Sequence, residues 1–458
     1  MKLVILNGSP KGMNSVTMQY VLFLKKKFPE HEVSIQNVCQ DISKLEASDE
    51  HFRQITDAVA VSDAVLWAFP LYYLLVHAHY KRFIELLFER HAEGSFRNKY
   101  AAVLSTSIHF FDHTAHEYIR GICEDLGMRC VGGYSAEMYD LLKEKERDRL
   151  LLFAKNLFKA VKEQAAVPRR YQPVAHAEFA YQGGKPPQAT DTQRKSVMIV
   201  TDSERPQDNL ARMVERLQGT FQGPVSVVNL NEIRIRGGCT GCIQCGLDNR
   251  CIYQDADDIR EVYERLMAAD IVLLAGTIRD RYLSSRWKLF FDRGFFHGHV
   301  PMFVGKQMGF VVSGPLMQLA NLRQILESYV LTQQANLVGM VTDECGDSAE
   351  LDRQLDNFAR QMIDSAVAGY IQPPNFLAVG SRKLFRDEIW SNLRLVFRAD
   401  HRYYRSRGLY DFPSRSLKTR LSEGILTLLL LIPRFRKEFR KRIKDEMVRP
   451  LTKVIEDS

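Results

Sequence analysis

The sequence predicts an α/β protein with two doubly wound parallel sheets in tandem, followed by a mainly helical, basic module. Three observations support this fold class. Short apolar segments alternate with helical segments from residue 1 to about 160, an order typical of a parallel sheet covered by helices on both faces. The same alternation begins again at Ser196. From Ser381 to the end, 20 Lys and Arg residues accompany 10 Asp and Glu residues, so the positive charge belongs to the last part of the chain.

The chain divides into four expected parts. Its 458 residues suggest about three domains, and a content of 45% hydrophobic and 26% charged residues is ordinary for a protein that buries large cores. A stretch rich in Pro, Gly, Gln and Ala has no apolar period and is typical of a linker. The expected parts are residues 1–164, the linker 165–194, residues 195–370 and the module 371–458.

Each half contains strands and helices in alternation. In the first half, strands are expected at 3–6, 32–37, 64–69 and 100–106, and a last strand is expected to start near 130. Helices are expected at 18–28, 50–61 and 79–90, and a further helix is expected to end at residue 126. In the second half, strands are expected at 197–202, 225–230, 271–275, 307–313 and 337–341, and helices at 209–217, 257–267, 287–296 and 322–329. Ligands of such sheets bind beyond the carboxyl ends of the strands, which are followed in the first half by loops 7–17, 69–75 and 105–113.

The loop after the first strand has the sequence NGSPKGMNSVT and leads into a helix. Free backbone N–H groups and the helix dipole favour an anion there, and hydroxyl groups with one Lys suit a phosphate monoester. A tight turn with a helix cap would explain Ser9 and Asn14 but does not require the other polar residues. Neither a Walker A nor a G-x-G-x-x-G pattern is present in this loop. The candidate phosphate ligands are Ser9, Lys11, Asn14, Ser15 and Thr17.

This loop resembles the N-terminal loop of the flavodoxin-like NAD(P)H-dependent FMN reductases, in which an NGSPR-x-x-G-N-T-type segment wraps the FMN phosphate. The resemblance covers about residues 1–150 and 196–345, and it implies two flavodoxin-like domains, FMN as cofactor and NAD(P)H as co-substrate. The segments AFPLYY, HYKRFIELLFER and STSIHFF resemble the family's flavin-ring segments. The resemblance implies a ring lined by Pro70, Leu71, Tyr72, Tyr73, Leu74, Ser105, Thr106, Ser107 and Ile108.

The two halves match the family unevenly. In the first half, Ala68-Phe69 and Glu89 depart from the pattern, whereas WKLFFDRGFF in the second half fits the family's K-x-x-x-D-R helix better. The second half's loop TDSERPQDN lacks the glycines and the Lys, and its carboxylates would repel a phosphate dianion. We therefore expect FMN in the first half.

Four cysteines, at positions 239, 242, 245 and 251, lie within thirteen residues of a glycine-rich loop in the second half. Thiolates at this spacing suit a polynuclear iron centre, a tetrahedral zinc ion or a thiol/disulfide relay. The segment GCTGCIQCGLDNRCIYQDADDI resembles the compact motif of the iron–sulfur flavoproteins, which implies a [4Fe–4S] cluster on Cys239, Cys242, Cys245 and Cys251. The resemblance therefore indicates a fused pseudo-dimer, with the phosphate loop in one half and the cysteines in the other.

The C-terminal module contains aromatic, basic helical segments at 385–397 and 435–448 and an apolar run at 425–432. That run is too short to span a bilayer, so it would either lie beside anionic lipid or pack on the other domains. No nucleic-acid readout motif is present, and nucleic acid is not expected as a partner. No signal peptide is expected either, and the expected location is cytoplasmic, with residues 381–458 as the segment that would contact a membrane.

These observations predict an FMN-dependent oxidoreductase. Electrons from NAD(P)H or a donor protein would pass through FMN to an iron–sulfur cluster and then to a small-molecule or protein acceptor, and a homo-oligomer is compatible with the sequence. The alternative is a flavodoxin-fold scaffold that has lost its cofactor and docks a partner or a membrane through its basic tail.

Overall fold

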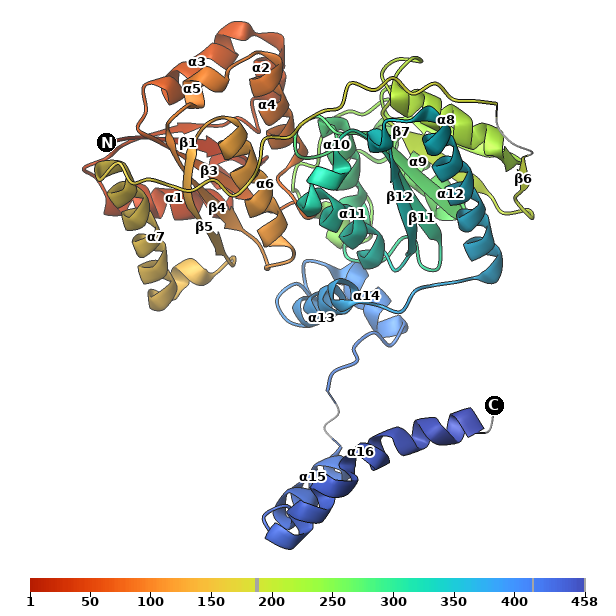
Figure 1. The fold of residues 1–458 in the computed structure, drawn as a ribbon. Coiled ribbons are helices and arrows are strands. Elements are labelled where there is room, and N and C mark those ends of the chain that lie inside the picture. The colour runs from red at the N-terminus through yellow and green to blue at the C-terminus, as the bar shows by residue number, and fades with distance from the viewer. Residues whose placement is uncertain (186–188, 414–415, 457–458) are drawn as a thin grey trace. The chain divides into compact units, whose positions relative to one another are not determined.

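The computed structural model describes residues 1–185, 189–413 and 416–456. The chain forms two compact units, Met1–Tyr404 and Arg405–Ser458, which can be followed by colour in Figure 1. The first unit contains both predicted sheets, and the second is helical in its described part.

The first sheet has five parallel strands in the order β2-β1-β3-β4-β5, which is the flavodoxin-like doubly wound order. Strands β1, β3 and β4 are buried along almost their whole length because helices cover both faces of the sheet. The order reverses between β1 and β3, and ligands bind at such a switch point. The strands are β1 (Lys2–Asn7), β2 (Glu32–Gln36), β3 (Ala64–Pro70), β4 (Tyr100–Thr106) and β5 (Arg129–Ala136).

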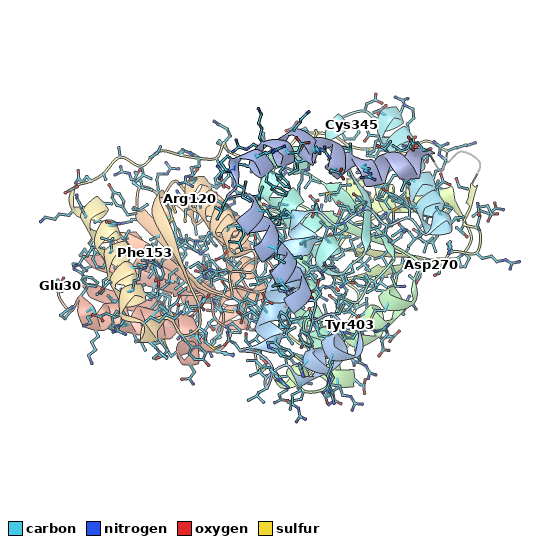
Figure 2. The ribbon with its side chains drawn as sticks, turned by 90° about the horizontal axis from the view of Figure 1, so that it is seen from below. Glu30, Arg120, Phe153, Asp270, Cys345 and Tyr403 are labelled. Carbon is cyan, nitrogen blue, oxygen red and sulfur yellow. The ribbon has the colours of Figure 1, made fainter. Side chains whose placement is uncertain are left out.

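The second sheet repeats this topology, with the parallel order β9-β7-β10-β11-β12. The predicted tandem of flavodoxin-like folds is therefore confirmed. In both halves an Asp ties the start of the third strand to the first: Asp63 accepts the N–H of Lys2, and Asp270, labelled in Figure 2, accepts that of Ser196. The strands are β7 (Val197–Thr201), β9 (Val225–Asn229), β10 (Ile271–Thr277), β11 (Gln307–Ser313) and β12 (Asn336–Thr342).

Helices flank both sheets (Figure 1). Those of the first half are α1 (Val16–Lys27), α2 (Ile42–Ala47), α3 (Asp49–Ala60), α4 (Ala78–Glu89), α5 (Glu93–Phe96), α6 (Asp112–Asp125) and α7 (Glu144–Lys162). Those of the second half are α8 (Asn209–Thr220), α9 (Ile259–Ala268), α10 (Ser285–Arg293), α11 (Ala320–Thr332) and α12 (Ser348–Ala368). Helices α7 and α12, which follow the last strand of each half, were not predicted from the sequence. The linker is irregular in its described part except for the short strand β6 (Thr190–Asp191), which pairs with β8 (Phe221–Gln222).

One large core runs through both halves, because α4 of the first half packs against α10 of the second. Each of these helices carries a buried Lys–carboxylate pair one turn apart. Lys81 Nζ lies 2.7 Å from Glu85 Oε1, and Lys288 pairs with Asp292. The equivalent helices of the two halves thus pack against each other within one core.

The segment after Pro374 contributes to both units. Helix α13 (Phe376–Trp390) and most of α14 (Arg398–Ser406) belong to the first unit, whereas α15 (Leu417–Leu429) and α16 (Pro433–Glu456) belong to the second. The predicted helical character of the module is confirmed. Among the described residues, no helix combines the length and apolarity needed to cross a bilayer.

Candidate functional site

The loop between β1 and α1 has a fixed backbone. Asn7 Oδ1 accepts the N–H of Ser9 at 3.0 Å, and Ser9 Oγ accepts the N–H of Lys11 at 3.2 Å. Ser15 caps α1 by accepting the N–H of Met18 at 3.2 Å. Gly8 is required by packing, because a Cβ atom there would lie 2.9 Å from Phe69 Cβ. These bonds hold the loop open towards the carboxyl ends of β1, β3 and β4.

A cavity of about 680 Å³ lies at this edge of the first sheet. A volume of this size is within the range of small-molecule and cofactor sites. Of the predicted phosphate ligands, Ser9, Lys11 and Ser15 line it, whereas Asn14 and Thr17 are not among the lining residues. Thr17 instead contacts Thr106, with 2.6 Å between the hydroxyl oxygens.

The predicted ring-binding loops also reach this cavity. Most of their residues line it, whereas Leu74 and Ser105 do not. Leu74 is buried in the core, and Ser105 Oγ lies 2.7 Å from His116 Nε2. Tyr72 and Leu75 exchange backbone hydrogen bonds of 2.8 and 3.0 Å, which close a tight turn. The predicted ring residues that line the cavity are Pro70, Leu71, Tyr72, Tyr73, Thr106, Ser107 and Ile108.

The opposite wall of the cavity comes from segments that sequence reasoning missed. Phe295 and His299 belong to the second half, and Arg382, Phe385 and Phe397 lie on or beside α13. Phe295 lies near the end of the family-like segment WKLFFDRGFF, whereas no family motif marks the other four residues. The only available signal for Phe385 and Phe397 was the aromatic and basic character of 385–397.

A buried His–Asp pair supports this wall. Asp400 Oδ2 lies 2.7 Å from His299 Nδ1 and accepts the backbone N–H of His299 at 2.9 Å. The imidazole packs against Phe385 and Phe397, with ring centroids 4.4 and 4.7 Å away. Gly298 has a positive φ of 60°, and a Cβ there would lie 2.5 Å from the Asp400 carboxylate, so the close approach requires glycine. The pair anchors the start of α14 to the second half.

The four-cysteine loop lies beside the first half. Its cysteines line a cavity of about 240 Å³, whose wall includes Lys11, Tyr72 and Tyr73 of the first half. A Cβ at Gly241 would lie 2.4 Å from the Tyr72 hydroxyl and 2.9 Å from Lys11 Cε. The structure therefore brings together the phosphate loop of one half and the cysteine loop of the other. All four cysteines are free thiols in this structure, namely Cys239, Cys242, Cys245 and Cys251.

The thiols of this loop differ in exposure and acidity. Cys245 is buried and Cys242 is exposed. Burial raises the pKa of Cys239 and of Cys245 to about 12 each, so both are neutral thiols in the absence of a bound cation. Beside the loop, the buried Arg293 donates to Gly237 O at 2.8 Å and forms an ion pair with Asp257. The hydrogen bond to Gly237 fixes the start of the loop against α10.

The spacing of the sulfurs bears on the kind of metal centre. A tetrahedral zinc ion with Zn–S bonds of 2.3 Å would hold its sulfurs about 3.8 Å apart. Among the residues that the structure describes, no three of the four cysteine sulfurs lie within 4.8 Å of one another. A polynuclear cluster separates its ligand sulfurs further, because each thiolate binds a different iron. In the conformation described, the four sulfurs are therefore not gathered around one tetrahedral position.

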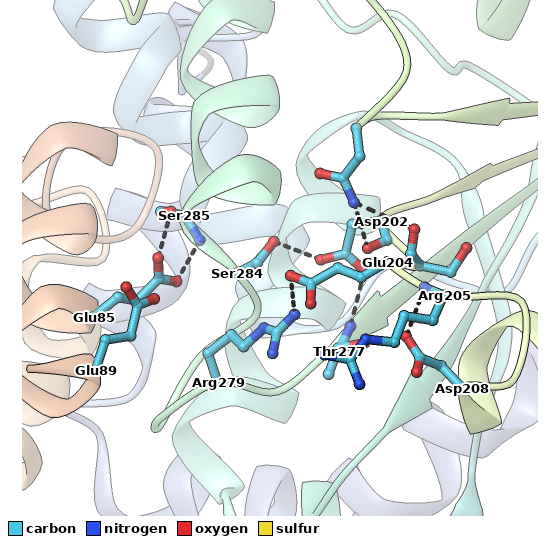
Figure 3. A network of polar contacts seen from close by, with 12 residues as sticks. Glu85, Glu89, Asp202, Glu204, Arg205, Asp208, Thr277, Arg279, Ser284 and Ser285 are labelled. Atoms are coloured by element: carbon cyan, nitrogen blue, oxygen red, sulfur yellow. Dashed lines mark hydrogen bonds and ion pairs between the residues drawn. The ribbon is translucent and has the colours of Figure 1, made fainter. Parts of the chain in front are cut away.

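The equivalent loop of the second half carries a network of polar contacts around Asp202 (Figure 3). Strand register places Asp202 where the first half has Gly8. The Asp202 carboxylate accepts the N–H of Thr277 at 3.1 Å and the hydroxyl of Ser284 at 2.5 Å. Burial raises the pKa of Asp202 to about 6. The second half thus has a carboxyl group in the loop where the first half has a closely packed glycine.

The other loops of this second site are also occupied. Asp343 accepts the hydroxyl of Ser313 at 2.7 Å and the N–H of Gly314 at 2.8 Å. The linker crosses the same edge, where Ala175 and Gln318 exchange hydrogen bonds of 3.0 and 2.8 Å. A cavity of about 480 Å³ remains there, lined by Asp343 and Glu344. Negative charge and the linker make this site unsuited to a phosphate dianion.

Comparison with known proteins follows this division into halves. The sequence model of the NADPH-dependent FMN reductase family matches residues 1–139 and 196–342. No curated protein sequence matches the chain. A similar solved structure is FerB, a flavoenzyme NAD(P)H:(acceptor) oxidoreductase from Paracoccus denitrificans, with 18% identity, coverage of 35% of this chain and 97% of that chain, and a TM-score of 0.29. Another is the FMN-dependent NADH-azoreductase from Bacillus anthracis in complex with FMN, with 13% identity, coverage of 36% and 99%, and a TM-score of 0.24.

Proposed function

This chain belongs to the NADPH-dependent FMN reductase family, and on this premise we propose that its first half binds FMN and passes electrons from NAD(P)H to a [4Fe–4S] cluster in its second half. One observation carries the proposal. Lys11 and the 70–73 turn line both the 680 Å³ cavity and the cysteine cavity. A flavin in the first cavity and a cluster in the second would therefore be separated by a single layer of side chains.

The phosphate end of the cofactor is proposed to lie against Ser9, Lys11 and Ser15. The Ser15 side chain caps α1, so a phosphate there would also meet the positive end of the helix dipole. Lys11 supplies one full positive charge at the edge shared with the cysteine loop. Asn14 and Thr17 are proposed to stabilise the loop. Thr17 does so through its contact with Thr106.

The ring end is proposed to lie against Pro70–Tyr73 and Thr106–Ile108. FMN supplies hydride and single-electron chemistry when bound, and the protein sets its position and surroundings. Tyr72 and Tyr73 are neutral phenols, because burial raises the pKa of both well above its ordinary value. Phe295, Phe385 and Phe397 line the same cavity and would shield a bound ring from water.

The cluster is proposed to be held by Cys239, Cys242, Cys245 and Cys251. The sequence spacing of these cysteines and their resemblance to the iron–sulfur flavoprotein motif support an iron–sulfur cluster over zinc or a thiol/disulfide relay. Binding would remove the thiol protons that burial retains on Cys239 and Cys245. NAD(P)H is the proposed donor, and the acceptor is a small molecule or a redox protein.

The second compact unit suggests an additional surface role. Helix α15 exposes the apolar side chains of Leu421, Ile425 and Leu428, and α16 is rich in Arg and Lys. Apolar and basic side chains on short helices favour the interface of an anionic bilayer. We propose that this unit contacts such a membrane peripherally.

A visible spectrum of the anaerobically purified protein tests the main proposal. Flavin absorption after reconstitution with FMN is the expected result, together with iron and acid-labile sulfide in a ratio near one. A protein that stays colourless with excess FMN would instead support the cofactor-free scaffold. Flavin without iron, but with bound zinc, would keep the first site and reject the cluster.

A further inference from the structure

We propose that Cys39, His77 and His79 form a separate metal site that takes one zinc-class divalent ion, at the junction of the first half and the cysteine loop. The Cys39 sulfur and one ring nitrogen of each histidine all lie within 4.8 Å of one another. In the part of the chain that the structure describes, no other trio of His, Cys, Asp or Glu side chains meets this condition. The inference depends neither on the flavin nor on the cluster.

The fold brings these residues together from two loops. Cys39 follows β2, and His77 and His79 stand at the start of α4, with His77 as the residue that caps this helix. Cys39 and His77 are fully buried, whereas His79 is half-buried. A thiol and two imidazoles are the side chains that zinc and cobalt prefer.

The closest pair of ligand atoms already has nearly the spacing that a metal requires. Cys39 Sγ lies 3.1 Å from His77 Nδ1. A tetrahedral ion with Zn–S and Zn–N bonds of ordinary length holds sulfur and nitrogen about 3.5 Å apart. These two atoms therefore need to separate by only a few tenths of an ångström.

Hydrogen bonds to backbone carbonyls fix both imidazoles in the tautomers that ligation needs. His77 Nε2 lies 2.8 Å from the Cys239 carbonyl oxygen, which can only accept, so Nε2 carries the proton and Nδ1 is the acceptor. Nδ1 lies near the thiol and also accepts the backbone N–H of His79 at 3.1 Å, so metal ligation would replace this capping bond. His79 Nδ1 lies 3.1 Å from the Cys39 carbonyl oxygen, so its Nε2 keeps a lone pair. Metal-ligating histidines characteristically donate their other N–H in this way.

The space beside His79 is kept free by a glycine of the cysteine loop. A Cβ at Gly238 would lie 2.7 Å from His79 Nε2 and 3.2 Å from His77 Cε1. Any side chain at 238 would therefore fill the position beside the coordinating nitrogen. A water molecule is the proposed fourth ligand, because three protein ligands leave one tetrahedral position open.

Binding would exchange one proton for one metal ion. The Cys39 thiol now donates to His77 Nδ1; its S–H bond would break, the proton would leave to solvent, and the thiolate sulfur would bind the ion. Because His77 also donates to Cys239 O, the bound ion would hold the first cysteine of the neighbouring loop in place. We therefore assign the site a positioning role for this loop.

Among the described residues, the second half has no matching set of ligands at the corresponding positions, so the proposed metal site belongs to the first half alone. The caps of α4 and α10 correspond, so His77 is matched by Ser284 and His79 by Arg286. Ser284 caps its helix through its hydroxyl group and needs no imidazole to do so. Capping alone therefore does not explain the two histidines and the thiol.

Cobalt titration of the metal-free, full-length protein tests the proposal. We expect Cys39→Ser to bind one Co²⁺ equivalent fewer than the wild type and to lose the thiolate charge-transfer absorption of that equivalent. His79→Gln should weaken Co²⁺ affinity at this site by about 10-fold or more. Cys345→Ser serves as the control and should match the wild type, because Cys345 is exposed and lies outside both the trio and the four-cysteine loop.

Thermal unfolding gives a second measurement, in case Cys39→Ser folds poorly. Zn²⁺ at a concentration near the wild-type Kd of this site should raise the unfolding temperature of the wild type and of Cys345→Ser by more than that of His79→Gln. Equal cobalt spectra for Cys39→Ser and the wild type would overturn the proposal. So would an equal Zn²⁺ effect on His79→Gln and the wild type.

Discussion

Glu85 and Asp292 each cap the helix that carries the other. The Glu85 carboxylate on α4 accepts the N–H of Ser285, where α10 begins, at 2.6 Å, and the Asp292 carboxylate on α10 accepts the N–H of Ala78, where α4 begins, at 2.7 Å. Figure 3 shows the Glu85 half of this exchange. Free N–H groups in the first turn favour a negative charge, so each half stabilises a helix of the other.

Removing the charge of Asp292 should destabilise the first unit. Lys288 is fully buried, and its remaining partner is the Tyr72 carbonyl oxygen at 3.0 Å. We expect Asp292→Asn to lower the free energy of unfolding by about 3 kcal/mol, because a buried cation loses its counter-charge. Urea unfolding measures this value. Glu89→Gln, which changes an exposed carboxylate on α4, is the control and should stay within about 0.5 kcal/mol of the wild type. Equal losses in both variants would contradict the prediction.

Lys11→Ala should weaken FMN binding. A charge-assisted hydrogen bond contributes about 1.5–3 kcal/mol, so the expected rise in Kd is about 10- to 100-fold. Quenching of flavin fluorescence gives the Kd directly. Lys26→Ala, at the far end of α1, removes a charge of the same sign and should leave the Kd unchanged. An unchanged Kd in Lys11→Ala would mean that the phosphate lies elsewhere.

Cys245→Ser should lower the iron content and leave FMN in place. Cys245 is the buried member of the cysteine set, and it is absent from the lining of the larger cavity. Iron analysis and the flavin spectrum of the same sample separate the two effects. Cys345→Ser changes an exposed cysteine outside the loop and serves as the control. Loss of flavin together with iron would show that the two sites depend on each other.

Asp202 should make the protein less stable as the pH rises. Burial raises its pKa to about 6 in the folded state, above the ordinary value of 3.8, so the folded protein holds this proton more tightly than the unfolded chain does. Its contribution to stability is therefore present at low pH and is lost as the pH rises from about 4 to 6. Between pH 4.5 and 7.5 this loss is about 2 kcal/mol.

Asp202→Asn should remove that pH-dependent loss. Urea unfolding of both proteins at pH 4.5 and 7.5 measures the difference. Glu204→Gln is the control, because Glu204 is exposed on the same loop. Parallel pH curves for Asp202→Asn and the wild type would show that this carboxyl titrates normally.

A chain that ends at Tyr404 should retain FMN binding, because the first compact unit ends there. It should also lose co-sedimentation with anionic liposomes if residues 405–458 make the membrane contact. A chain that ends at Pro373 lacks Phe385 and Phe397 of the cavity wall, so we expect it to bind FMN more weakly. Liposome binding that survives removal of 405–458 would reject the membrane role.

The sequence by itself determined the two parallel sheets and the nature of the two loops. Buried strands of a parallel sheet are continuous apolar runs, and turns and caps use a few residue types, so residues 3–17 and the cysteines at 239–251 carry their local structure within a dozen positions. The repeat of this pattern at Ser196 was also sufficient to predict the tandem fold.

Only the tertiary structure decided which of these residues meet. Gly241 lies against Tyr72 and Lys11, and His299 and Phe385 face the loop at Ser9 across one cavity, although hundreds of residues of chain separate some of these partners. It also decided that Thr17 contacts Thr106 and that Cys39 lies beside His77. Hydrophobic periodicity specifies which face of an element is buried, but the neighbour across that face is chosen by packing between distant segments.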